Sequence, residues 1–144
     1  MLSRIMIVAG AAGFGGLAFV AATPASVPEP VQGAPVEVQV NLRCTGTGVE
    51  FSVDPWIVEV EQGGQVEWAL NPGADSDEIE ISAKSGRWPF AQQTHRGNKQ
   101  SRARANDMRP NQSGQRFQYN ITLICNPEGQ EPFEVVIDPD IIIR

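Results

Sequence analysis

The sequence is poor in the side chains that most enzymes and metal proteins use for chemistry. Its 144 residues include one histidine, two cysteines, three methionines and one tyrosine. A structural zinc site takes four ligands, most often Cys and His, so here it would have to recruit carboxylates. No Ser/His/Asp set can be assembled convincingly around the single imidazole, His95, and no phosphate-loop or dinucleotide motif is present. We therefore expect no catalytic residue, no metal and no cofactor, and a protein that binds or supports instead.

The beginning of the chain predicts export from the cytoplasm. Arg4 precedes residues 5–23, which carry no charge. This run is long enough for a membrane anchor, which needs about 20 apolar residues, but it also suits a signal peptide cleaved at a small residue. In either case Arg4 stays inside and the rest of the chain lies outside the cytoplasm. We expect a periplasmic or other extracytoplasmic protein held in the inner membrane by its N-terminus. A cleaved signal peptide and a soluble periplasmic protein are the alternative.

Residues 24–35 predict a spacer between residues 1–23, the anchor or signal peptide, and a folded domain. They contain Pro24, Pro28, Pro30 and Pro35. Proline-rich segments favour the extended polyproline form, so this linker would hold the domain away from the bilayer.

From residue 36 onward the apolar residues alternate with polar ones, which predicts β-strands. The runs are bounded by turn signals such as Gly63-Gly64 and Asn71-Pro72-Gly73. Seven or so strands without a helical period indicate an antiparallel sandwich or barrel, so we expect an all-β domain at 36–144. The predicted strands lie within residues 36–42, 49–53, 56–61, 65–70, 78–82, 115–125, 133–138 and 141–143.

The two cysteines are the candidates for a disulfide. Cys44 lies two residues after the first predicted strand, and Cys125 ends the long strand at 115–125. An oxidising compartment permits a bond between them. Such a bond would close a loop of about 80 residues and stabilise the fold by about 4–5 kcal/mol in the chain-entropy account.

Charge is segregated along the domain. Residues 84–116 hold eight of the eleven basic side chains, whereas residues 36–83 are rich in acids, within a net charge of −6. The basic side chains fall mainly in a predicted loop at 83–114, which is long enough to suggest a function. Two explanations stay open: the loop pairs with the acidic face of its own domain, or it docks on an acidic protein surface. The candidate interaction residues are Arg87, Trp88, Phe90, Arg96, Lys99, Arg102, Arg104 and Arg109, since Arg and aromatic residues are enriched at interface cores.

The segment from Phe51 to Asn71 resembles the cupredoxin family, whose fold carries blue-copper centres. The shared features are an aromatic residue, a proline a few residues later, an alternating strand, a glycine-rich turn and a Val-x-Trp element leading to Asn. The resemblance covers residues 36–82 and 113–144, and it implies a Greek-key β-sandwich, here preceded by an N-terminal hydrophobic helix. An immunoglobulin-like sandwich is the alternative. Cys44, Trp56 and Cys125 follow its Cys…Trp…Cys order, but Leu123 stands where that family has its tyrosine.

The copper ligands of the family have no counterparts here. A blue-copper site takes a Cys, two His and usually an axial Met. Cys125 falls at the family's Cys position, but residues 75–78 stand at the first His position, and residues 126–132 contain neither His nor Met. The resemblance therefore implies a member of the fold without copper. Oxygen ligands for a hard cation at Asp75, Asp77 and Glu78 are the remaining metal hypothesis, without a calcium-loop signature.

Together these observations lead us to expect a non-catalytic accessory subunit, tethered to the membrane and docked on the outer face of an integral membrane protein complex. By analogy with other cupredoxin-like domains, a respiratory or photosynthetic assembly is the expected kind of partner. A soluble periplasmic electron carrier or metal chaperone, and a small-ligand binding module, are the alternatives. An acidic protein outside the cytoplasm is a poor nucleic-acid binder.

Overall fold

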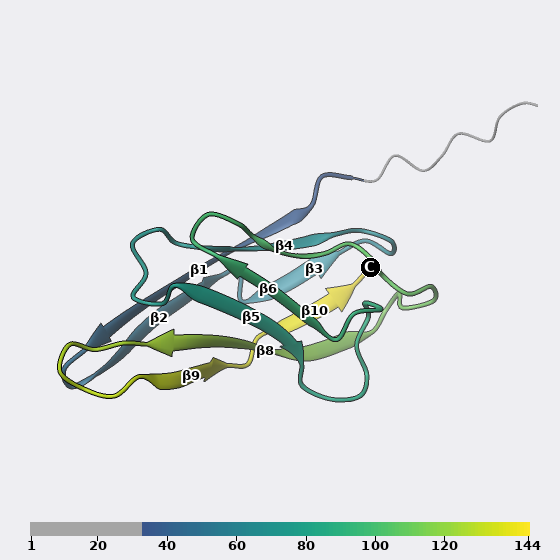
Figure 1. Cartoon of the computed structure of the whole chain (residues 1–144). Helices are drawn as coiled ribbons and strands as arrows, with labels where there is room; N and C mark the ends of the chain where they lie inside the picture. Colours follow the sequence, from purple (N-terminus) through teal and green to yellow (C-terminus); the bar gives the residue numbers. More distant parts are fainter. Residues whose placement is uncertain (1–32) are drawn as a thin grey trace, which may run out of the picture. The chain divides into compact units, whose positions relative to one another are not determined.

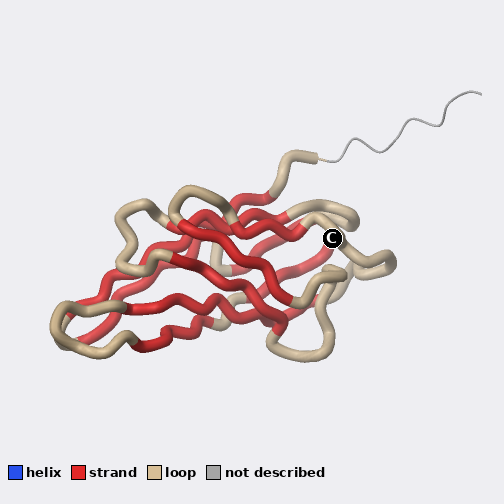
Figure 2. The backbone as a smooth tube through the Cα atoms, in the orientation of Figure 1, coloured by secondary structure: helices blue, strands red, loops and turns tan. Residues whose placement is uncertain are grey.

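The described part of the chain is built from β-strands. The computed structural model describes residues 33–144, and every helix or strand element within them is a strand (Figures 1 and 2). None of these elements is a helix that could cross a bilayer. The predicted hydrophobic helix at 1–23, and the linker as far as residue 32, lie outside the described residues. The strands are β1 (Val36–Thr45), β2 (Gly48–Asp54), β3 (Ile57–Val60), β4 (Val66–Leu70), β5 (Glu78–Ala83), β6 (Thr94–Asn98), β7 (Ala103–Ala105), β8 (Arg116–Cys125), β9 (Phe133–Ile137) and β10 (Asp140–Ile143).

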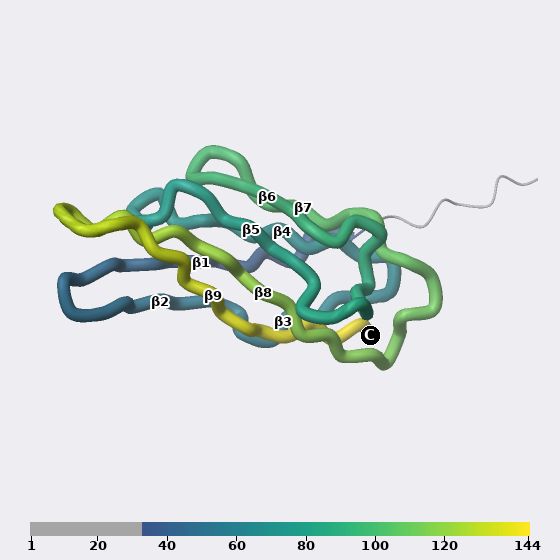
Figure 3. Tube along the Cα trace, turned by 60° about the horizontal axis from the view of Figure 1, so that its bottom comes forward, coloured from purple at the N-terminus to yellow at the C-terminus, as the bar shows by residue number. Residues whose placement is uncertain are grey.

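The strands form two mixed sheets that enclose one core (Figure 3). The first sheet has the order β2-β1-β4-β7. The second has the order β3-β10-β8-β5-β6. In addition, β9 pairs with residues 121–125 of β8, whereas β10 pairs with residues 116–118. The β1–β4 and β3–β10 pairs are parallel, and the others are antiparallel. The prediction of an all-β, sandwich-like fold is thus confirmed, whereas the expected antiparallel pairing is wrong for β1–β4 and β3–β10.

The period of two explains which side chains form the core. In β1, Val38, Val40 and Leu42 are buried, while the residues between them are exposed or partly exposed. In β8 every second residue from Phe117 to Cys125 is buried. These two inner faces meet across the sandwich, because β1 contacts β8 as well as β3. Each fully buried aliphatic side chain of this kind stabilises the fold by about 1.5–3 kcal/mol.

The predicted loop at 83–114 requires a correction, because two of its segments are strands. β6 pairs with β5, with His95 opposite Ile81, and β7 pairs with β4, with Ala103 opposite Trp68. Residues 94–98 lack the apolar alternation that predicts a strand, and the alternation of β7 extends over three residues. Their backbones complete the sheet edges, and the lack of a side chain at Gly97 allows β6 to approach the backbone at Ala103 closely.

The two sides of the sandwich differ as a result. On one side, β6 of the second sheet and β7 of the first lie against each other and close the gap between the sheets. We call this the closed side. On the other side, β2 is the edge of the first sheet, and β3 and β9 form the edge of the second. We call this the open side. Within residues 33–144, the outer edges of β2, β3 and β9 pair with no further strand.

Candidate interaction surfaces

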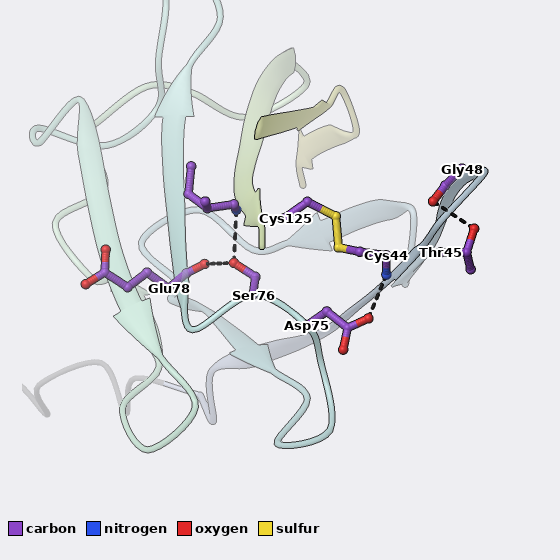
Figure 4. The surroundings of a disulfide bond; sticks show 8 residues. Cys44, Thr45, Gly48, Asp75, Ser76, Glu78 and Cys125 are labelled. Atoms are coloured by element: carbon purple, nitrogen blue, oxygen red, sulfur yellow. Dashed lines mark hydrogen bonds between the residues drawn. A yellow bond between two sulfur atoms is a disulfide. The ribbon is translucent and has the colours of Figure 1, made fainter. Parts of the chain in front are cut away.

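The predicted disulfide is present. Cys44 of β1 and Cys125 of β8 are bonded, with their Cα atoms 6.0 Å apart (Figure 4). The bond joins the two sheets, because β1 and β8 belong to different ones. Cys125 is fully buried. The sulfur that would bind copper in a blue-copper protein is thus committed to a covalent bond.

The segment where the resemblance places a histidine ligand fastens the same end of the sandwich by hydrogen bonds (Figure 4). The Asp75 carboxylate accepts a hydrogen bond of 2.6 Å from the backbone N–H of Cys44. The Ser76 hydroxyl is fully buried, donates to the carbonyl of Glu78 at 2.7 Å and accepts from the N–H of Ile124 at 3.0 Å. These bonds connect the β4–β5 loop to the ends of β1 and β8.

The hard-cation hypothesis at residues 75–78 has no support in this geometry. Asp77 forms an ion pair with Lys99 at 3.0 Å, and Asp75 is bonded to the β1 backbone. Within residues 33–144, no three His, Cys, Asp or Glu side chains come together in a way that would hold a metal ion.

His95 lies far from the disulfide. It stands opposite Ile81, which stands opposite Ile121 in β8, and Cys125 follows four residues later. At about 3.3 Å per residue and 4.8 Å between strands, the two backbones are separated by about 13 Å along the strands and about 10 Å across them. His95 and Cys125 therefore cannot ligate one ion in this fold.

His95 instead belongs to a buried aromatic cluster. Its ring is nearly parallel to Trp68, with the centroids 6.2 Å apart, and it also contacts Trp88 and Phe90. The indole N–H of Trp68 donates to the hydroxyl of Tyr119 at 3.1 Å, which joins β4 to β8. Burial lowers the pKa of His95 and is only partly opposed by Asp107 and by two backbone contacts. The neutral imidazole is the form that suits this core.

Two of the predicted interaction residues are core residues, which corrects the expectation that they contact a partner. Trp88 is 2% exposed and Phe90 is 0% exposed. Their rings meet edge to face, with the centroids 5.5 Å apart. They cover the aromatic cluster from the segment between β5 and β6 and are not available to another protein.

We call residues 84–116 the basic segment. Its cations pair mostly with acids of the same domain. Lys84 pairs with Asp138, Arg96 with Glu80, Lys99 with Asp77, Arg102 with Glu37 and Glu67, Arg104 with Glu67, and Arg116 with Asp140. Arg87 donates to the amide oxygen of Gln115 at 2.8 Å, and Arg109 is exposed. Of the two explanations for the charge asymmetry, self-pairing is therefore the one this structure supports.

The centre of this pairing is Glu67. In the first sheet Glu37, Glu67 and Arg104 stand side by side on β1, β4 and β7. Two carboxylates directly opposite each other repel, and the guanidinium groups of Arg102 and Arg104 offset this. The side chain of Glu67 is only 5% exposed, and its hydrogen bond from Arg102 lowers the pKa of its carboxyl group. The arginines of the basic segment thus hold β7 against β4.

An exposed aromatic patch lies on the open side, where sequence reasoning did not place an interface. Phe51 of β2 is 50% exposed, Trp56 is 43% exposed and Phe133 of β9 is 41% exposed. The Phe51 and Trp56 rings contact each other, with their centroids 6.4 Å apart. We call Phe51 and Trp56 the open-side patch. Phe51 stands opposite Leu42 and Phe133 stands opposite Cys125, so both face inward in their strands and alternation alone predicts them as core residues.

No protein-family model matches the sequence, and no curated protein matches it.

Proposed function

We propose that this chain is a copper-free, non-catalytic subunit of cupredoxin-like fold that docks on an integral membrane protein complex outside the cytoplasm. Residues 5–23 would tether it, and residues 24–35 would space the domain from the bilayer. The observation that carries the proposal is the bond between Cys125 and Cys44, because it occupies the sulfur that a blue-copper centre needs as a thiolate.

The topology supports the cupredoxin-like part of the proposal. The chain passes from the first sheet to the second between β2 and β3, and it returns to the first sheet only for β4 and β7. Such repeated crossings between two packed sheets are typical of Greek-key sandwiches. The disulfide is compatible with an oxidising, extracytoplasmic compartment.

The open-side patch supports the docking part. Large apolar side chains that lie together on a surface and are bordered by polar residues commonly mark protein–protein contacts. The basic segment has no comparable free surface, because its aromatic residues are buried and most of its cations are paired.

Two measurements on the full chain test the proposal. Affinity isolation of the chain from its own membranes in a mild detergent should recover other polypeptides in fixed ratio. Recovery of the chain alone would contradict docking. Cupric ion added to the purified chain, oxidised or reduced, should not produce the intense blue absorption of a copper–thiolate centre. Appearance of that absorption would instead favour an electron carrier.

A further inference from the structure

The open side exposes an unpaired strand edge beside the aromatic patch. Within the described residues, β2 pairs with β1 alone, so its other edge presents unpaired backbone N–H and C=O groups. Such an edge is a template for another strand unless the protein covers or disrupts it. The seven residues of β2 contain no proline, and the β7 edge of the same sheet is closed against β6. β2 is therefore the edge of the first sheet that is open to a partner.

The two faces of β2 have opposite chemistry. Val49, Phe51 and Val53 point to the inner face, since they stand opposite Cys44, Leu42 and Val40 of β1. Glu50 and Asp54 alternate with them on the outer face and are exposed. Neither acid has an ion pair within residues 33–144, although Arg43 stands opposite Glu50 in the register.

This alternation specifies the strand that would fit beside β2. Neighbouring strands align their faces, so every second side chain of the added strand would lie on the same side as Phe51. Those positions suit apolar residues, which would cover Phe51 and Trp56. The positions between them would lie beside Glu50 and Asp54 and suit Lys or Arg.

The same charges argue against a second copy of this chain as the occupant. The protein has a net charge of −6, and the edge strand of the second sheet adds Glu134 next to Phe133. Pairing β2 with β2 or β9 of another copy would bring carboxylates together, and like charges placed opposite each other destabilise a strand pair.

We propose that β2 accepts an extended segment of a partner protein in which apolar and basic residues alternate, and that the open-side patch covers its apolar side chains. This inference rests on the proposed function, because it names the surface and the partner chemistry through which the subunit docks. Backbone hydrogen bonds to β2 would supply affinity, and the side chains on its two faces would supply specificity.

A designed peptide tests the surface directly. The probe is the seven-residue peptide Lys-Val-Lys-Val-Lys-Val-Lys, titrated into the full chain in dodecyl maltoside, with Glu-Val-Glu-Val-Glu-Val-Glu as the charge-reversed control. The basic peptide should bind, slow amide hydrogen exchange along residues 48–54 and bind more weakly as salt is added. Equal binding of both peptides, or protection at residues other than 48–54, would overturn the inference.

Substitutions in the patch provide the second arm. Phe51→Ser and Trp56→Ser should each weaken binding of the basic peptide about tenfold or more, as expected for central aromatic contacts. The matched control is Val136→Ser, since Val136 is equally exposed at 50% but lies on the outer face of β9. It should leave the affinity unchanged. Thermal melts of all variants separate lost binding from lost folding, and unchanged affinity in folded Phe51→Ser and Trp56→Ser variants would refute the assignment.

The two proposals fail in different ways. If the Phe51→Ser/Trp56→Ser double variant still copurifies with the membrane partners of the wild type, the docking function stands and the β2 surface is wrong. If the wild-type chain is recovered alone but binds the basic peptide as described, the surface stands and docking on a membrane complex is wrong.

Discussion

Ser76 lies in the segment where the cupredoxin resemblance places a histidine ligand, and in this fold it has a structural role. Its buried hydroxyl satisfies the carbonyl of Glu78 and the N–H of Ile124. Removing one partner of a buried hydrogen bond leaves the other group unsatisfied, at a cost of about 1–3 kcal/mol. Ser76→Ala should therefore lower the free energy of unfolding by about 1–3 kcal/mol. In urea titrations this loss appears as a lower midpoint at an unchanged m-value.

The control for Ser76 is Ser85→Ala, because Ser85 is exposed and, within residues 33–144, bonds to the nearby backbone of Arg87 alone. Exposed substitutions of this kind usually change stability by less than about 0.5 kcal/mol. Equal losses of stability in the two variants would show that Ser76 does not stabilise the end of the sandwich that carries the disulfide.

His95 makes stability depend on pH in a defined range. Burial lowers its pKa below the usual value of about 6.5, so the unfolded chain binds a proton more readily than the folded one. Its contribution is therefore intact above about pH 6.5, is lost as the pH falls toward the folded pKa, and then levels off. Stability should fall by at most about 1.4 kcal/mol per pH unit in that range.

Urea titrations between about pH 7.5 and 5.5 check this prediction, because the carboxyl groups titrate mainly below that range. His95 is the single histidine of the chain. His95→Phe keeps an aromatic ring in the cluster and should abolish the pH dependence. A slope that persists in this variant would show that other groups are responsible.

At the level of elements, the closed side depends on the contact between β6 and β7. A Cβ atom on Gly97 would lie 2.4 Å from the backbone nitrogen of Ala103, so the strands would have to separate. Overpacking of this kind typically costs about 1–3 kcal/mol. Gly97→Ala should lower the midpoint of unfolding accordingly and speed amide exchange in β6 and β7.

Gly86→Ala is the matched control for Gly97, because nothing lies within 4 Å of a Cβ at Gly86. Its stability should equal or slightly exceed that of the wild type, since alanine reduces the entropy of the unfolded chain. If Gly97→Ala were as stable as Gly86→Ala, the closed side would not be tightly packed.

The elements also show which parts of the fold can be predicted from sequence. Strands with apolar alternation, such as β1 and β8, were predicted because burial on one face produces the pattern. β6 and β7 were not, because Thr94–Asn98 and Ala103–Ala105 owe their conformation to pairing with β5 and β4. Strand pairing between residues distant in the chain leaves no local signal.

The interaction surface was harder to predict for the same reason. The asymmetry of charge was visible in the sequence, but the register that brings Arg104 beside Glu67 was not. Trp88 and Phe90 were predicted to contact a partner because they lie among cations, yet their side chains are buried. The alternation of β2 would predict Phe51 as a core residue. Its side chain is nevertheless half exposed, because β2 is an edge strand.

For the molecule as a whole, the disulfide is the largest single constraint. It spans 81 residues of sequence and joins the two sheets. Replacing both cysteines, in Cys44→Ala/Cys125→Ala, should reduce the free energy of unfolding by about 2–5 kcal/mol. Chemical reduction of the wild type should give a similar loss in urea titrations. A negligible loss would mean that the cross-link does not constrain the unfolded chain.

Native mass spectrometry of the chain released from its own membranes in a mild detergent reports both its partners and any bound metal in one spectrum. If the chain is a copper-free docking subunit, as we propose, its mass should include other polypeptides, an intact disulfide and no copper on this chain. A spectrum of the lone chain, or of the chain carrying a copper ion, would contradict it.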